Sequence, residues 1–132
     1  MGVDAAYHGM DSQVLHHDSP IYKNLREYQG HGSVYGIIPA KRIKWGPLGE
    51  WHQEEIRVKG DRITVTVDGQ VIVDGNIRTA TKGHNVAPDG SDKNPYTVDK
   101  LNHPGLFNKK GHIGLCGHGE GIKYRNIRVK EL

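Results

Sequence analysis

Apolar and polar residues alternate along the middle of the chain. Ile63, Val65 and Val67 occupy every second position and are separated by threonines. This period of two is typical of a strand with one buried and one solvated face. The flanking triplets Lys59–Asp61 and Asp68–Gln70 place Gly and Asp where a tight turn needs positive φ. The pattern predicts three consecutive antiparallel strands joined by short hairpins.

Strand-like patterns recur along the chain, and we predict strands at residues 10–16, 33–38, 51–59, 62–68, 70–74, 112–116 and 122–130. Trp51 is expected to pack in the core or at its rim. In the last strand the apolar phase changes between Tyr124 and Ile127, which indicates either a bulge near residues 125–126 or a strand buried on both faces. The buried set is expected to include Ile63, Val65, Val67, Ile113, Leu115, Ile127 and Val129. The irregular segments 17–32 and 83–110 are long enough either to carry a binding site or to be disordered.

Composition limits the fold to one domain, residues 1–132, with eighteen glycines and one phenylalanine. These values favour an all-β antiparallel sandwich or barrel. The net charge of +3 comes from interspersed charges of both signs, so we expect no nucleic-acid partner. The single Cys116 excludes an internal disulfide. We expect no membrane insertion, because no apolar run reaches spanning length, and Met1–Gly9 lacks the features of a signal peptide.

Polar groups suited to sugar chemistry are predicted to share strand faces. Alternation places Asp11 and Gln13 on one face of their strand, and His31 and Tyr35 on one face of theirs. Carboxylate, amide, imidazole and phenol groups hydrogen-bond hydroxyls and transfer protons. We therefore treat these four residues as candidate catalytic residues. A solvated strand face with ordinary polar residues is the alternative.

Histidines, cations and tryptophan supply further candidates. His118 lies in a Gly-rich turn and is a candidate acid/base or metal ligand, or else is simply held by backbone hydrogen bonds. In the segment His16-His17-Asp18, at most one imidazole could join Asp18 at an ion, and a polar strand end is the more ordinary interpretation. Two explanations fit the cluster of Lys41, Arg42 and Trp45: it binds a sugar by stacking and hydrogen bonds, or the cations are solvated and Trp45 fills the rim of a sandwich.

Several motifs occur in an order that resembles one family: GMDSQVL (9–15), DSPIY (18–22), HGSVYGIIPAKR (31–42), GEWHQEEIRVKGDRITVTVDGQVIVDGNI (49–77), HPGLFNKKGHIGL (103–115) and GHGEGIKYRNIRVKEL (117–132). This family, long known as domain of unknown function 1080, is described as 3-keto-disaccharide hydrolases or 3-keto-glycoside lyase/hydratases. The resemblance implies a jelly-roll sandwich of the concanavalin A-like type, a carbohydrate substrate, and a secreted or periplasmic location. Family members begin with further strands, so this domain is expected to be partial, with its N-terminal strands missing. Exposed strand edges then favour a homo-oligomer.

The resemblance implies cleavage of 3-keto-glycosides, by hydrolysis or by elimination followed by hydration. His31 or His118 would act as base or ligand, Asp11 and Gln13 would orient the substrate, and Tyr35 would donate a proton. A divalent metal ion is a possible cofactor for polarising the ketone. Asp18, Lys41, Arg42 and Trp45 are expected to bind substrate. A non-catalytic carbohydrate-binding module, or an inactive structural remnant of the family, is the alternative.

Overall fold

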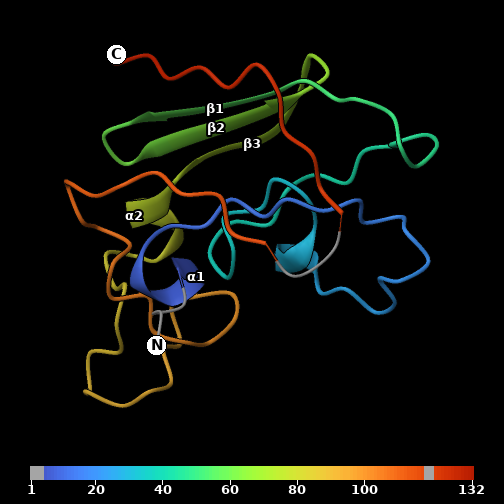
Figure 1. The fold of residues 1–132 in the computed structure, drawn as a ribbon. Helices are drawn as coiled ribbons and strands as arrows, with labels where there is room; N and C mark the ends of the chain where they lie inside the picture. Colours follow the sequence, from blue (N-terminus) through green and yellow to red (C-terminus); the bar gives the residue numbers. More distant parts are fainter. Residues whose placement is uncertain (1–4, 118–120) are drawn as a thin grey trace.

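The computed structural model describes residues 5–117 and 121–132. Its regular elements are α1 (Ala5–His8), a 3₁₀ helix (Glu27–Gln29), β1 (Glu54–Lys59), β2 (Arg62–Val67), β3 (Gln70–Asn76) and α2 (Ile77–Ala80). The strands form one antiparallel sheet in the order β1-β2-β3 (Figure 1). The predicted three-stranded meander is therefore confirmed, although its first strand begins at Glu54 instead of Trp51.

Strand pairing in the sheet follows the two hairpins, with one irregularity. Lys59 pairs with Arg62 across the first turn, and Val67 pairs with Gln70 across the second. The register between β2 and β3 shifts between Val65 and Thr66. This shift adds one residue to β3, so that the consecutive residues Ile72 and Val73 are both buried.

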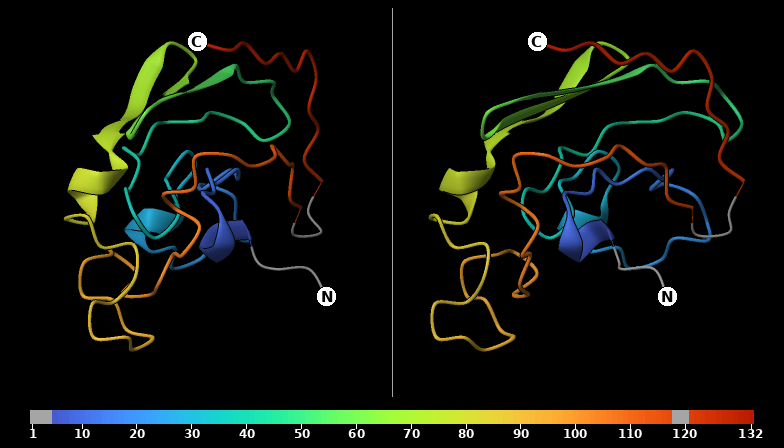
Figure 2. Two further views of the ribbon diagram at one scale, coloured as in Figure 1. Left: turned by 90° about the vertical axis from the view of Figure 1, so that its left-hand side faces the viewer. Right: turned by 60° about the vertical axis from the view of Figure 1, so that its left-hand side comes forward.

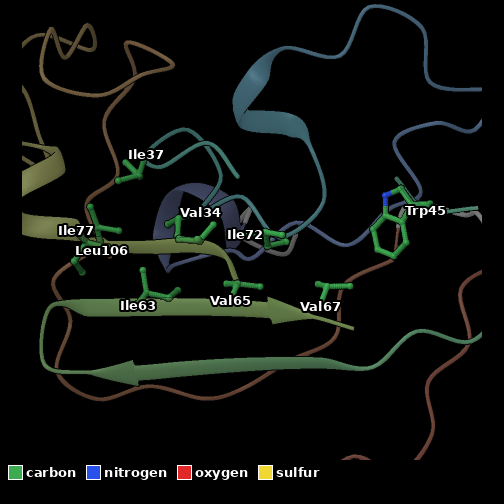
Figure 3. Packing of buried hydrophobic residues seen from close by; sticks show 10 residues of the cluster. Val34, Ile37, Trp45, Ile63, Val65, Val67, Ile72, Ile77 and Leu106 are labelled. Atoms are coloured by element: carbon green, nitrogen blue, oxygen red, sulfur yellow. The ribbon is translucent and has the colours of Figure 1, made fainter. Parts of the chain in front are cut away.

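The hydrophobic core lies against one face of the sheet, and Figure 3 shows the β2 side chains Ile63, Val65 and Val67 pointing into it. All three have at most 1% of their surface exposed. Ile72 and Val73 of β3 and Ile77 of α2 extend this core, and the irregular segments that precede and follow the sheet in sequence contribute Val34, Ile37, Trp45 and Leu106. Half of the core residues thus come from the sheet itself. Irregular segments cover the core face of this small sheet, as the two views of Figure 2 show.

The strands expected near the C-terminus do not form among the described residues. Residues 111–117 and 121–132 have no strand assignment. Four side chains expected in the core are exposed instead: Ile113 by 82%, Leu115 by 60%, Ile127 by 63% and Val129 by 74%. An alternating segment becomes a strand only when a partner strand satisfies its backbone. No backbone hydrogen bond joins this described part of the chain to the sheet.

Other parts of the sequence also pack differently from expectation. Trp51 is 49% exposed, and the guanidinium carbon of Arg125 lies 4.1 Å from the centre of its ring. The segments 10–16 and 33–38 meet through a single bridge between Ser12 and Val34, without forming full strands. The described residues contain no helix long and apolar enough to cross a membrane.

The irregular segment 83–110 is ordered by buried polar contacts. Asn94 is fully buried, and its side chain donates to the carbonyl of His84 and accepts from the amide of Tyr96. His103 and Asp99 form a buried pair, with 2.8 Å between Nε2 and Oδ2. Gly36, with a φ of 73°, lies against this pair, and a Cβ there would be 2.2 Å from Asp99 Oδ2. These contacts fix the loop against the rest of the domain.

Candidate active site

Two polar segments, residues 11–15 and 31–35, lie side by side and bring several of the predicted site residues near one another. The amide of Tyr35 donates to the carbonyl of Asp11 at 3.0 Å, and the amide of Gln13 donates to the carbonyl of Ser33 at 3.0 Å. This antiparallel pairing places residue 12 opposite 34 and residue 11 opposite 35. The amide of Gly32 donates to the carbonyl of Gln13, so residues 32 and 33 both lie opposite residue 13, and the alternation of side chains is interrupted before His31. A common face for Asp11, Gln13, His31 and Tyr35 stays a prediction.

His31 is buried, with only 5% of its surface exposed, and is not the exposed site residue that the sequence suggested. Its Nδ1 accepts a hydrogen bond from the amide of Leu15 at 3.2 Å. This contact requires the proton of a neutral ring to be on Nε2. Nε2 lies 3.1 Å from Oε2 of Glu54, although the alignment is too poor for a regular hydrogen bond.

Glu54 is a site residue that the sequence interpretation missed. It is the first residue of β1 and pairs with Val67, so it lies on the core face of the sheet at its end. Its Oε2 contacts His31, whereas its Oε1 is buried and has no hydrogen-bond partner. The sequence indicated this residue, because strand alternation places Glu54 on the same face as Ile56 and Val58. A carboxylate at a position where the pattern calls for an apolar residue is a candidate functional group.

Tyr124 is a second candidate residue that the sequence interpretation missed, since it was treated only as one of the apolar positions of the last predicted strand. Burial is the largest cause that raises the pKa of its phenol, followed by the negative charge of Glu54 and then by Cys116 and Asp11. The C-terminal segment thus brings a phenol into the electrostatic range of both carboxylates. A phenol is protonated at neutral pH and can donate a hydrogen bond or a proton.

Trp45 forms a buried wall behind His31. It is 7% exposed, so it cannot stack openly on a sugar as one interpretation of the sequence suggested. Its ring makes edge contacts with His31 and His52, with centroids 4.6 Å and 4.5 Å apart, and it also packs against His16 and His17. The packing alternative for Trp45 is therefore the one that the structure favours.

His17 is held in a neutral state beside this wall. Its Nδ1 accepts from the Trp45 indole at 3.2 Å, which leaves Nε2 to donate to the carbonyl of Ile43 at 3.0 Å. Burial is the main cause that lowers the pKa of His17. The hydrogen bond to the carbonyl of Ile43 raises this pKa, whereas the positive charge of Arg42 lowers it further. His17 therefore supports Trp45 and has no open nitrogen for a substrate.

The remaining predicted residues lie around this centre in different environments. Tyr35 is half-buried, and its hydroxyl accepts a hydrogen bond from Nε2 of Gln29 at 3.3 Å. Asp11 and Gln13 are half-buried, whereas Asp18, Lys41 and Arg42 are exposed. His118 lies outside the described residues. Within residues 5–117 and 121–132, no three His, Cys, Asp or Glu side chains are arranged to hold a metal ion.

Comparison with known proteins identifies the family. A profile of the 3-keto-alpha-glucoside-1,2-lyase-like domain matches residues 3–130. The chain belongs to this family. A 3-keto-disaccharide hydrolase from Bacteroides thetaiotaomicron is 31% identical over 102 residues, which cover 76% of this chain and 35% of that protein.

The fold has a counterpart among solved structures. A crystal structure from Parabacteroides distasonis, of a protein provisionally described as a glycosyl hydrolase, matches with a TM-score of 0.55 at 22% identity. The match covers 76% of this chain and 52% of that one. The 3-keto-alpha-glucoside-1,2-lyase-like domain described here thus spans about a third of its curated relative and about half of its structural relative.

Proposed function

We propose that this domain cleaves 3-keto-glycosides by elimination followed by hydration. A ketone at C3 acidifies the proton at C2, so that a base can remove it while the C1–O bond breaks. The leaving oxygen takes up a proton, and a double bond forms between C1 and C2. Water then adds its oxygen to C1 and a proton to C2. The family match and the printed name of the Bacteroides relative support this substrate class.

The observation that carries the proposal is that Glu54 contacts His31 and that its charge acts on the phenol of Tyr124. In this scheme Glu54 is the base, because its Oε1 has no hydrogen-bond partner, whereas Nδ1 of His31 already accepts from the amide of Leu15 and Nε2 carries the proton of the neutral ring. His31 is a positioning residue that orients the carboxylate. Tyr124 is the acid for the leaving oxygen, since its phenol carries a proton at neutral pH and lies within the electrostatic range of Glu54 and Asp11. Gln13 can donate its amide to the ketone oxygen, and Asp11 can accept from a sugar hydroxyl.

Ordinary glycoside hydrolysis is the second candidate function, and one observation favours it. Asp11 and Glu54 are both close enough to Tyr124 to raise the pKa of its phenol. Two carboxylates around one sugar are the usual equipment of a glycosidase. That mechanism needs no ketone, so substrate choice separates the two proposals.

Turnover with matched substrates tests both proposals. The protein is incubated in D₂O with 3-keto-trehalose and with trehalose, each with and without a divalent metal ion, and the products are followed by NMR. Elimination and hydration predict cleavage of the keto sugar alone, with deuterium at C2 of the product. Direct hydrolysis predicts no deuterium at C2 beyond that exchanged in the intact substrate. Binding without cleavage would instead support a carbohydrate-binding module.

The compartment and the assembly state belong to the same proposal. The family resemblance supports a location outside the cytoplasm. The core-face residues Ile56 and Val58 on the edge strand β1 are 47% and 43% exposed, which supports association between copies. Sedimentation velocity over a range of protein concentrations tests this: a monodisperse monomer at high concentration would contradict it.

A further inference from the structure

A small cationic hollow lies on the outer face of the sheet, the face away from the core and from Glu54. It has a volume of about 200 Å³ and is lined by Arg57, Lys59, Arg62 and Thr64. In the β1–β2 register Arg57 is opposite Thr64 and Lys59 is opposite Arg62. These four side chains therefore project from the same face, next to the first hairpin. They form a patch that the proposed catalytic chemistry does not use.

The positive charges in this hollow are only partly balanced. Arg62 is paired with Asp74, at 2.8 Å between Nη2 and Oδ1, and Thr64 also contacts this carboxylate. Asp61, the acid beside the turn, is committed to Arg78 at 2.9 Å. Within residues 5–117 and 121–132, Arg57 and Lys59 make no ion pair with any carboxylate, including that of Glu55 on the same face.

This arrangement is unfavourable in the absence of a ligand. Like charges directly across an antiparallel pair destabilise the sheet, and Lys59 and Arg62 are such a pair. Arg57 adds a third cation on the diagonal to Arg62. An oxyanion in the hollow would reduce the repulsion, because Arg offers a planar fork of donors and Lys a point charge.

We propose that this hollow binds one oxyanion group, the carboxylate or sulfate of an acidic saccharide. Its size suits a single group, and its open position at the sheet surface suits a group presented by a longer chain outside the protein. The oxyanion chemistry rests on the residues alone, whereas the saccharide rests on the proposed function. The hollow is thus a second carbohydrate contact, on the face opposite the candidate active site.

Binding is measured by NMR titration of the ¹⁵N-labelled protein, independently of turnover. The probes are digalacturonate, a sulfated disaccharide, neutral cellobiose and inorganic sulfate, at constant ionic strength. The expected result is saturable shifts of the β1–β2 amides with the two acidic saccharides and none with cellobiose. Equal shifts with cellobiose would overturn the oxyanion assignment, and saturable binding of inorganic sulfate alone would overturn the saccharide.

Charge-removing variants locate the site. Arg57→Gln combined with Lys59→Gln should weaken binding of the acidic saccharides at least about tenfold, since two of the three cations are lost. The matched control, Lys109→Gln, removes an exposed cation elsewhere and should bind normally. Without ligand, Lys59→Gln should raise the melting temperature by about 1–4 °C by relieving the cross-strand repulsion. Unchanged affinity in the double variant would overturn the proposal.

Discussion

Replacing Glu54 by Gln removes one negative charge from the candidate active site while keeping the shape of the side chain. Glu54 lies 3.1 Å from Nε2 of His31, and its side chain is 22% exposed. The contact is poorly aligned, so the lost interaction should cost about 1 kcal/mol of the free energy of unfolding. For a domain of this size, that corresponds to a fall of about 3–5 °C in melting temperature. The variant should therefore fold.

The effect on catalysis should be much larger than the effect on stability. If Glu54 removes the proton at C2, its loss should lower kcat for a 3-keto-glycoside by about 10²–10⁴-fold. An amide has no basic site to replace the carboxylate. The control is Glu55→Gln, the adjacent residue on the opposite face of β1, which should retain normal turnover.

The same variant tests the geometry without a substrate. The negative charge of Glu54 is one of the causes that raise the pKa of Tyr124, so Glu54→Gln should lower the pKa of this phenol toward its ordinary value. Ultraviolet titration of tyrosinate absorbance, with Tyr124→Phe to assign the signal, measures this shift. Normal turnover of a folded Glu54→Gln protein would refute the role of base. An unchanged pKa for Tyr124 would refute the proximity of the two side chains.

Three further predictions concern the fold. Gly36→Ala should lower the free energy of unfolding by about 3 kcal/mol or more, because the new Cβ would clash with Asp99. The control, Gly83→Ala, has a similar φ but open space around it, and should lower the free energy of unfolding by only about 1 kcal/mol. Thermal unfolding measures both variants. Ile63→Ala should cost about 2–5 kcal/mol by chemical denaturation, because Ile63 is 1% exposed in the core; a smaller loss would mean that the site is loosely packed. Because the pKa of His17 is lowered in the folded protein, the unfolded chain binds a proton near pH 6.5, where the folded chain does not yet bind one. The melting temperature should therefore fall as the pH drops below 6.5. His17→Gln should make this dependence on pH weaker.

The meander was predictable because everything that defines it is local. Alternation around Val65 gives the buried face, and the glycines at 60 and 69 give the turns, with φ values of 59° and 80°. The pairing of residues 11–15 with 31–35 joins two segments that the sequence alone could not bring together. The backbone at Gly32, with a φ of 79°, interrupts the alternation in the second of these segments. A period of two therefore does not fix the orientation of His31 relative to Tyr35.

The errors arose where structure depends on distant partners. Val129 has the parity of a strand residue, yet no backbone hydrogen bond pairs the described C-terminal residues 121–132 with a strand, and Val129 is exposed. His31 looked like a polar residue on an open face, but Trp45 and Glu54 cover it from separate parts of the chain. Tyr124 was not among the predicted site residues, because Glu54 and Asp11, the carboxylates that raise its pKa, lie 70 or more positions earlier in the chain. None of these contacts leaves a local signal.

The register of β1 determines both surfaces to which we assign function. Glu54 lies on the core face at the end of the strand, whereas Arg57 and Lys59 point to the outer face. Because side chains alternate with a period of two, a slip of one residue would move the carboxylate away from His31 and the cations into the core at the same time. The cross-strand apolar pairs Ile56–Val65 and Val58–Ile63, each with a buried residue on β2, oppose such a slip. The half-exposed valine and isoleucine of β1 therefore position both sites, although neither residue contacts a ligand.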